Sequence, residues 1–275
     1  MDKKYGKNRT SENRISSAFS HGKAIIPFIT CGDPSIDITE QLVLRMADAG
    51  ADLIELGIPF SDPTAEGPVI QAAEIRAVSR GVTTDKIFAM VERIRTRTEI
   101  PLLFMTYANS IFSYDATRFM ERASNVHIDG IILPDLPFEE RGEFSQPCRA
   151  HDITQISMIA PTSRERIEKI ASQAEGFVYC VSSPGCTGIR REFSTDIAKM
   201  VTLVKEVKSI PCVIGFGIHT PEQAANMAKH SDGMVVGSTI VQICEKYGNA
   251  CIPKVVEYIK TMKNALRNVD LYSFV

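Results

Sequence analysis

The sequence predicts one domain over residues 1–275, a (β/α)8 barrel of the TIM type with an N-terminal capping helix and extra helices in its loops. The 275 residues match the roughly 250 that such a barrel takes. Short apolar runs alternate with segments of helical periodicity, eight times along the chain. Neither a Gly/Ser-rich linker nor a change of composition divides the chain. An open parallel sheet is the alternative that this pattern leaves.

The eight apolar runs are the expected strands. None of them alternates polar and apolar residues, which is typical of parallel strands covered on both faces. They lie at residues 24–30, 53–56, 102–105, 130–133, 155–159, 177–181, 212–216 and 233–236. Strands that alternate with helices form a parallel sheet with right-handed crossovers, and eight such units in one domain favour closure into a barrel.

Helical periodicity and helix-start signals fill the intervals between the strands. Apolar residues at 87, 90, 91 and 94 form one stripe with the spacing of a helix. Thr162 with Glu165, and Thr220 with Gln223, have the spacing of capping boxes, the second with Pro221 at the first helical position. The stretch 12–21 is expected to form the helix that covers the N-terminal end of the barrel.

Composition and missing motifs exclude several kinds of partner. The 31 basic and 33 acidic side chains leave a net charge of -2, so nucleic acid is not an expected partner. No apolar stretch is long enough for a membrane span, and residues 1–14 lack the apolar core of a secretory signal. The seven cysteines stand singly, which predicts a reducing compartment, the cytoplasm, without disulfides or a zinc site. Because the histidines form no spaced pair and no G-x-G-x-x-G follows the first strand, we expect neither a metal nor a dinucleotide cofactor.

Glycines follow the last three expected strands, at Gly188, Gly217 and Gly237. Glycine lets backbone N–H groups approach an anion, and barrels often hold phosphate after strands seven and eight, at the start of a short extra helix. Residues 238–241 are suited to open that helix, with the Ser238 hydroxyl as a further donor. A single glycine after a strand is explained equally well by a tight turn to the next helix. Glycines in all three of these loops favour a phosphate site.

A carboxylate interrupts the second apolar run, at Glu55. Carboxylates are rarely buried without a partner or a purpose, and low solvation raises a carboxyl pKa toward the range that general acid or base catalysis needs. An ion pair inside the barrel is the structural alternative. The next loop, 57–68, carries Asp62 and Glu66, each of which by itself reads as a solvated charge. This loop and the loop 182–192 are long enough to be lids.

Seven segments carry a resemblance that spans nearly the whole chain. They read PFITCGDP (27–34), ADLIELGIPFSDPTAEGPVIQ (51–71), MTYAN (105–109), DGIILPDLPFEE (129–140), CTG (186–188), GFGIHTPEQ (215–223) and VVGSTIV (235–241). In this order they resemble the tryptophan synthase alpha chain family, for which the ELG-x-PFSDP-x-A stretch is highly specific. The resemblance implies a retro-aldol cleavage of indole-3-glycerol phosphate to indole and glyceraldehyde 3-phosphate, without a cofactor.

The resemblance also implies roles for particular residues. Glu55 matches the general acid/base that protonates indole C3, and Glu66 matches the carboxylate that meets the indole N–H and stabilises the cationic intermediate. Thr187 matches a loop residue that hydrogen-bonds this carboxylate when the loop closes. Tyr179 matches a tyrosine near the general acid, and Phe28 matches a wall of the indole pocket. The phosphate ligands of the family match Gly188, Gly217, Gly237 and Ser238.

The implied partner is a pyridoxal-phosphate-dependent beta chain. It receives indole through a tunnel in an α2β2 heterotetramer and touches the loop around Asp62.

Two departures from the family bear on activity. Glu66 stands where the family normally has Asp, and a misplacement near 1 Å can cost on the order of a hundredfold in rate. In the second, Ser182-Ser183-Pro184 replaces the usual loop pattern, and proline restricts loop motion.

These departures leave alternatives to an active lyase subunit. One is a weakly active or inactive regulatory alpha subunit that activates the beta chain. Another is a stand-alone indole-3-glycerol-phosphate lyase that releases indole.

Overall fold

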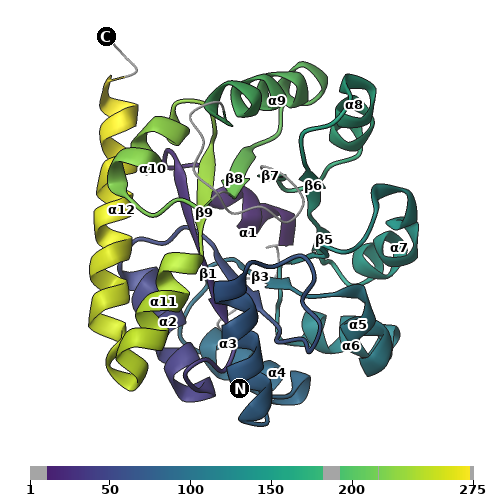
Figure 1. Cartoon of the computed structure of the whole chain (residues 1–275). Helices are drawn as coiled ribbons and strands as arrows, with labels where there is room; N and C mark the ends of the chain where they lie inside the picture. Colours follow the sequence, from purple (N-terminus) through teal and green to yellow (C-terminus); the bar gives the residue numbers. More distant parts are fainter. Residues whose placement is uncertain (1–10, 182–192, 216, 273–275) are drawn as a thin grey trace.

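A computed structural model describes residues 11–181, 193–215 and 217–272 of the chain. Its parallel strands lie in the order β5-β4-β3-β2-β1-β9-β8-β7-β6. Their bounds are β1 Ala24–Thr30, β2 Ile54–Gly57, β3 Leu102–Met105, β4 Gly130–Ile132, β5 Thr154–Gln155, β6 Ser157–Ile159, β7 Val178–Val181, β8 Cys212–Gly215 and β9 Gly233–Val236. Strands β5 and β6 end this order on opposite sides, yet only Ile156 separates them in the chain. The sheet is therefore a closed barrel, and helices surround it (Figure 1).

The predicted strands are confirmed, with one difference at the fifth. It was expected as a single strand over 155–159 and consists of two short pieces. Thr154 pairs with Gly130 of β4, whereas Ser157 pairs with Val178 of β7. Between them the Ile156 N–H donates to the Ile131 carbonyl at 2.9 Å. The apolar run does not reveal this change of neighbour, because it arises only where the barrel closes.

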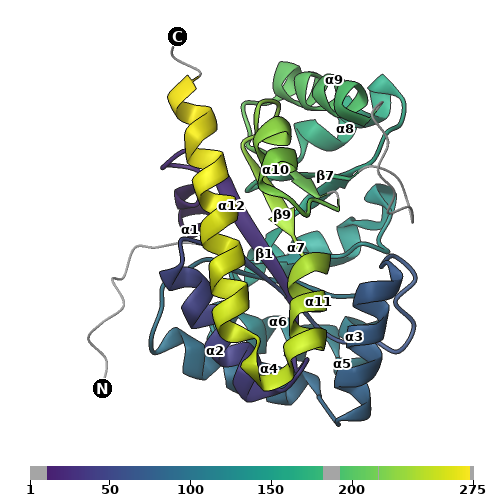
Figure 2. The same ribbon diagram turned by 60° about the vertical axis from the view of Figure 1, so that its left-hand side comes forward.

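Helices connect the strands and cover their outer faces. Their bounds are α1 Ser11–Ser17, α2 Ile36–Asp48, α3 Pro68–Ser79, α4 Thr84–Arg95, α5 Ala108–Tyr114, α6 Ala116–Asn125, α7 Gly142–Ala150, α8 Arg164–Ser172, α9 Phe193–Val207, α10 Pro221–Ala228, α11 Ser238–Tyr247 and α12 Ile252–Tyr272, with 3-10 turns η1 Phe138–Glu140 and η2 Gly248–Ala250. Two helices follow β2, β3 and β9, which confirms the extra loop helices. The long α12 packs along α2, α10 and α11 (Figure 2).

One of the two predicted capping boxes forms. The Thr220 hydroxyl accepts from the Gln223 N–H at 3.3 Å, and the Gln223 side chain accepts from the Thr220 N–H at 3.2 Å. The box predicted at Thr162 is wrong, because the N-cap of α8 is Ser163, whose hydroxyl accepts from the Arg166 N–H at 3.3 Å. Two adjacent hydroxyl residues both fit the local rule, and only the position of the helix chooses between them.

Three aspartates fix the N-terminal end of the barrel by the same arrangement. Asp52, Asp129 and Asp232 each lie just before a strand and accept a hydrogen bond from a backbone N–H near the start of the neighbouring strand. Each also pairs with a cation: the partners are Lys263 at 2.6 Å, Arg95 at 2.7 Å and Lys205 at 2.7 Å, respectively. These charges stabilise one end of the barrel, and they leave the carboxyl ends of the strands for chemistry.

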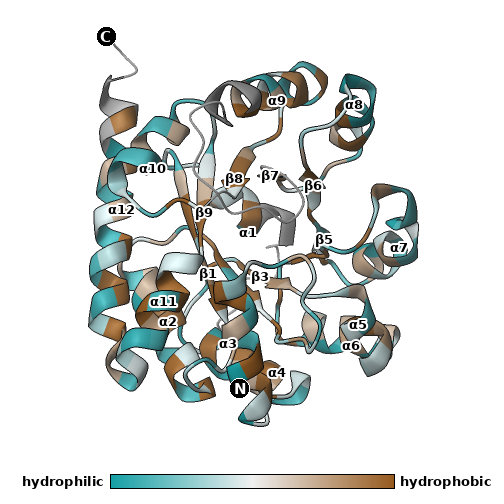
Figure 3. Ribbon diagram, viewed as in Figure 1, coloured by the Kyte–Doolittle hydropathy of each residue, from teal (hydrophilic) through white to brown (hydrophobic). Residues whose placement is uncertain are grey.

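Apolar side chains fill the barrel and the space between the strands and the helices. Figure 3 shows hydrophobic residues on the strands and on the helix faces turned toward them. Ile15 of α1 is fully buried against the inside of the barrel, and Arg14 pairs with Asp129. The predicted capping helix is therefore confirmed. Within the part of the chain that the structure describes, every helix is too short or too polar to cross a membrane.

Candidate active site

Glu55 lies on β2 and is fully buried in the barrel. Its neighbours in register are Phe28 of β1 and Leu103 of β3. Neither carboxyl oxygen has a hydrogen-bond partner among the described residues, so the ion-pair alternative is wrong for that part of the chain. Burial, and then the charge of Glu66, raise the pKa of Glu55 well above its ordinary value. A raised pKa favours the protonated form that a general acid needs.

Glu66 lies in the loop between β2 and α3, and its neighbours hold that loop in place. The Tyr107 hydroxyl, which follows β3, accepts from the Ala65 N–H at 3.0 Å and donates to the Glu66 carboxylate. The Gln71 amide of α3 donates to the carbonyls of Pro63 at 3.2 Å and Glu66 at 2.9 Å. The carboxylate is thus presented by a loop that is anchored at both of its flanks.

Glu66 has a raised pKa as well. Burial raises the pKa of Glu66 to about 7, with the Tyr107 hydrogen bond lowering it and the charge of Asp135 raising it. Asp135 follows β4 and accepts from the Ala108 N–H, with its two oxygens at 3.1 and 3.2 Å. Near neutral pH a large fraction of Glu66 is therefore ionised. A fully buried carboxyl with a raised pKa and a nearby ionised carboxylate suit distinct acid and charge-stabilising roles.

Phe28 and Tyr179 form an apolar wall beside the carboxyls, and they are 3% and 7% exposed. A Cβ on Gly57 would lie 2.6 Å from the Phe28 ring, and one on Gly215 would lie 2.3 Å from the Tyr179 ring. Only glycine at these two positions leaves room for the rings. Burial, followed by the charges of Glu55 and Glu66, raises the pKa of Tyr179. The wall and the carboxyls therefore belong to one site.

The predicted phosphate residues Gly217, Gly237 and Ser238 lie at and near the start of α11. As predicted, α11 begins at Ser238, directly after β9, with Gly237 as its N-cap. The N–H groups in the first turn of a helix have no intrahelical acceptor and favour an anion. Gly217, after β8, has φ +27°, a conformation that favours glycine. A Cβ on Gly237 would lie 3.2 Å from the ring of Phe28, which is the neighbour of Glu55 in register.

Comparison with known proteins decides the family. The family model of the tryptophan synthase alpha chain matches residues 16–267. The tryptophan synthase alpha chain of Caldanaerobacter subterraneus subsp. tengcongensis is 45% identical over 261 residues, which cover 92% of this chain and 100% of that one. The corresponding chain of Lacticaseibacillus casei is 42% identical over 262 residues, 94% of this chain and 98% of that one. The chain belongs to the tryptophan synthase alpha chain family.

Solved structures of this family have the same fold. Tryptophan synthase subunit alpha from Legionella pneumophila str. Paris has a TM-score of 0.85 at 34% identity, covering 95% of this chain and 100% of that one. A Mycobacterium tuberculosis tryptophan synthase has a TM-score of 0.84 at 28% identity, covering 94% of this chain and 98% of that one. The TIM barrel is therefore confirmed. As a tryptophan synthase alpha chain, this protein is a carbon–carbon lyase of tryptophan biosynthesis that cleaves indole-3-glycerol phosphate.

A third buried carboxyl, on α3, was not among the predicted site residues. Glu74 of α3 is 2% exposed, and its Oε2 has no hydrogen-bond partner among the described residues. Burial, and then the charge of Glu66, raise its pKa to about 8. One feature of the sequence could have indicated Glu74: it lies between Ala73 and Ala77, small residues that are fully buried on the side of α3 that faces the barrel. Glu74 lies one turn after Gln71, which binds the Glu66 loop.

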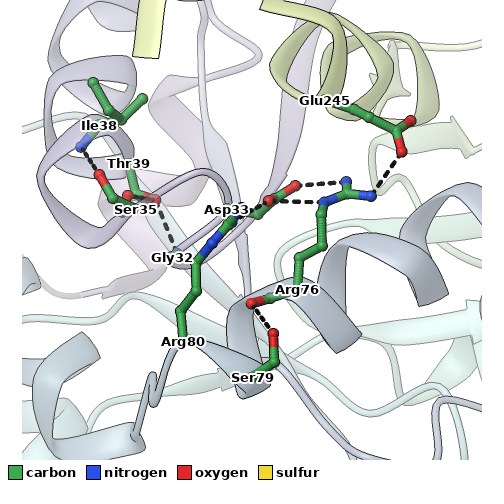
Figure 4. A network of polar contacts seen from close by, with 9 residues as sticks. All are labelled: Gly32, Asp33, Ser35, Ile38, Thr39, Arg76, Ser79, Arg80 and Glu245. Carbon is green, nitrogen blue, oxygen red and sulfur yellow. Dashed lines mark hydrogen bonds and ion pairs between the residues drawn. The ribbon is translucent and has the colours of Figure 1, made fainter. Parts of the chain in front are cut away.

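An ion-pair network joins the two helices that carry the site (Figure 4). Asp33, 5% exposed after β1, accepts from Arg76 Nε at 3.1 Å and Nη2 at 2.8 Å, and from Arg80 Nη1 at 3.0 Å. Arg76 also donates to Glu245 of α11 at 2.8 Å. Arg76 thus links α3, which follows Glu66, to α11, which begins at Ser238.

The remaining predicted residues lie at or beyond the edge of the described site. Asp62 is exposed, while Thr187 and Gly188 lie outside the described residues. No group of His, Cys, Asp and Glu in the described ranges is arranged to hold a metal ion. Tyr107 and Asp135 belong to two of the segments that resemble the family, 105–109 and 129–140. The sequence predicts no role for either residue, because their contacts join loops that are far apart in the chain.

Proposed function

We propose that Glu55 and Glu66 are the two carboxyls that cleave indole-3-glycerol phosphate in this chain, without a cofactor. The observation that carries this assignment is a fully buried Glu55, without a hydrogen-bond partner among the described residues, beside an ionisable Glu66. A raised pKa favours the protonated carboxyl, which is the form that donates a proton. Exclusion of water strengthens the attraction between a carboxylate and a positive charge that develops in the substrate.

In the proposed reaction Glu55 first donates a proton to the substrate and later takes a proton from it. Glu55 donates its proton to indole C3, and the ring becomes a cation with its positive charge at the indole nitrogen. Glu66 accepts a hydrogen bond from the indole N–H, and its negative charge stabilises the cation. The substrate hydroxyl then gives its proton to Glu55 while the bond to C3 breaks, so glyceraldehyde 3-phosphate leaves and the electron pair returns to the indole ring.

The proposed binding mode follows the two ends of the site. The indole ring lies against Phe28 and Tyr179, whose burial makes an apolar wall of suitable width. The phosphate is bound by Gly188, Gly217, Gly237 and Ser238. Thr187 is proposed to hydrogen-bond Glu66 when substrate is present.

Glu66 is proposed to keep the charge-stabilising role that Asp has in the family. The longer side chain is supported by the Tyr107 hydroxyl, which holds both Glu66 and the Ala65 N–H. We expect Glu66→Ala to abolish nearly all cleavage. Glu66→Asp should match or exceed the parent rate if the shorter carboxylate still reaches the indole nitrogen. A Glu66→Ala variant as fast as the parent would show that this residue is only a loop charge.

The proposed partner is a pyridoxal-phosphate-dependent tryptophan synthase beta chain in an α2β2 complex, and the proposed compartment is the cytoplasm. Asp62 is exposed on the loop that carries Glu66, so a partner that touches Asp62 also adjusts the carboxylate. A mainly regulatory subunit remains the second candidate. It is favoured by the Glu66 pKa of about 7, which leaves part of the population without the negative charge at neutral pH.

The test is cleavage of indole-3-glycerol phosphate by the purified chain, with and without a cognate beta chain. Glu55→Gln keeps the size of the side chain and removes the proton donor, so turnover should fall by about a hundredfold or more. Parent turnover that is measurable only with the beta chain supports the active subunit. A parent that stays inactive under both conditions but still activates the beta chain is a regulatory subunit. Near-normal turnover of Glu55→Gln would overturn the assignment of the acid.

A further inference from the structure

Glu74 is a buried carboxyl of α3 to which the proposed mechanism gives no role. Its side chain is 2% exposed, and its Oε2 has no hydrogen-bond partner among the described residues. It lies on the side of α3 that faces the barrel, between the fully buried Ala73 and Ala77. A polar atom without a partner costs free energy wherever water is excluded. Glu74 is therefore a candidate for a role in the neighbouring site.

Helix α3 brings Glu74 next to the loop that carries Glu66. Residues three apart on a helix are neighbours on one face, so Glu74 lies beside Gln71. The Gln71 amide donates to the Glu66 carbonyl at 2.9 Å. On the other flank of this loop the Tyr107 hydroxyl accepts from the Ala65 N–H at 3.0 Å. The loop with Glu66 is thus bound to the same turn of α3 that carries Glu74.

The two carboxyls differ in how much water reaches them. Glu66 is partly exposed, whereas Glu74 is buried. Two neighbouring carboxylates repel each other, so the pair releases its first proton more readily than its second. Water solvates a single charge better at Glu66, so the remaining proton stays on Glu74. The pKa values agree: burial raises that of Glu66 to about 7, and burial followed by the charge of Glu66 raises that of Glu74 to about 8.

We propose that Glu74 is a positioning residue for Glu66: the pair carries one negative charge, and the proton on Glu74 keeps that charge on the carboxylate that meets the indole N–H. The inference rests on the proposed function, which gives Glu66 its role. An ionised Glu74 adds a second buried charge beside the loop, and repulsion together with entering water displaces the Glu66 carboxylate. Because a small misplacement of such a group costs much of the rate, cleavage requires Glu74 in its protonated form.

The other charged groups around α3 leave this pair to itself. Those on the sides of β1 and α11 are paired with one another, and they are Asp33, Arg76, Arg80 and Glu245 (Figure 4). Tyr107 stays neutral, because burial, followed by the charge of Glu66, raises its pKa. Among the described residues, the charge that raises the pKa of Glu74 is that of Glu66. The proton on Glu74 therefore responds chiefly to the carboxylate that it positions.

The experiment compares kcat/KM for indole-3-glycerol phosphate at about pH 7 and about pH 9, as a ratio within each protein. If cleavage requires a protonated Glu74, a pKa of about 8 gives the parent a roughly tenfold fall over this interval. Glu74→Gln keeps the neutral shape and cannot ionise, so its fall should be less than about threefold. Glu245→Gln is the matched control, because this carboxylate pairs with Arg76 of α3 but is 54% exposed, and it should fall as the parent does. An equal fall in the parent and Glu74→Gln overturns the proposal, since the alkaline limb then arises from another group.

Carbon-13 NMR of the full chain, labelled at the glutamate carboxyls, gives a second readout that needs no turnover. The signal that is missing from Glu74→Gln belongs to Glu74, and its pKa in the parent should be about 8. In Glu66→Gln the neighbouring charge is gone, so this pKa should fall by more than about half a pH unit. An unchanged pKa of Glu74 in Glu66→Gln overturns the proposal, whatever the turnover. A coupled pair in a chain that cleaves no substrate, with or without a beta chain, supports the pair and overturns the proposed function alone.

Discussion

Replacing Glu74 by Gln should stabilise the fold at alkaline pH and leave its pH dependence in acid unchanged. Burial raises the pKa of Glu74 from 4.5 to about 8, and its side chain is 2% exposed. Between these values the unfolded chain has released the proton and the folded chain still holds it. Stability of the parent therefore falls by up to about 1.4 kcal/mol for each pH unit. The variant has no such loss, so the difference grows to a ceiling of about 5 kcal/mol near pH 8 and then stays constant.

Urea unfolding of both proteins at pH steps from about 4 to about 9 measures this difference. An amide at position 74 also lacks a partner, but that cost is the same at every pH, so the slope is diagnostic. Glu257→Gln is the control, because that side chain is 69% exposed and its ion-pair partner in the described part of the chain is Lys254. Its curve should run parallel to that of the parent. A Glu74→Gln curve that also runs parallel to the parent would refute the buried, protonated carboxyl.

Three further changes test other parts of the site. Tyr107→Phe removes the hydrogen bond that lowers the pKa of Glu66, so the acidic limb of kcat/KM, expected near the Glu66 pKa of about 7, should move up by roughly half to one pH unit. If the acidic limb of kcat/KM does not move, Tyr107 does not set the pKa of Glu66. Gly237→Val should raise KM more than about tenfold with little loss of folding stability, since its side chain would meet Phe28 and cover the α11 amides. An unchanged KM would mean that the phosphate of the substrate binds elsewhere. Arg76→Ala should cost roughly 3 kcal/mol in unfolding free energy, because it leaves the buried Asp33 with Arg80 as its one remaining partner among the described residues, whereas Arg164→Ala at the surface should leave the unfolding free energy nearly unchanged. Equal costs would mean that Asp33 is solvated.

Particular residues show how far a local pattern reaches. The strand carrying Glu55 was predictable, because four buried residues in a row need an apolar run and a charge within it is conspicuous. Glu74 was not, since its helix contains other polar residues and only packing shows which of them turns toward the barrel. The start of α11 followed from Gly237-Ser238, but the direction of His219 did not. The ring nitrogen Nδ1 of His219 lies 2.8 Å from the hydroxyl of Thr239, which is 20 positions further along the chain.

The sequence by itself determined the order of strands and helices, the parallel barrel and the family, because periodicity and short motifs are local properties of the chain. Tertiary structure alone decided that the barrel closes at Ile156, that Tyr107 holds Glu66, and that Glu55 has no described partner. It also decided the direction of the pKa shifts in the site. The pKa of a carboxyl depends on how much water is excluded and which charges surround it, and both are sums over side chains that folding brings together from distant positions.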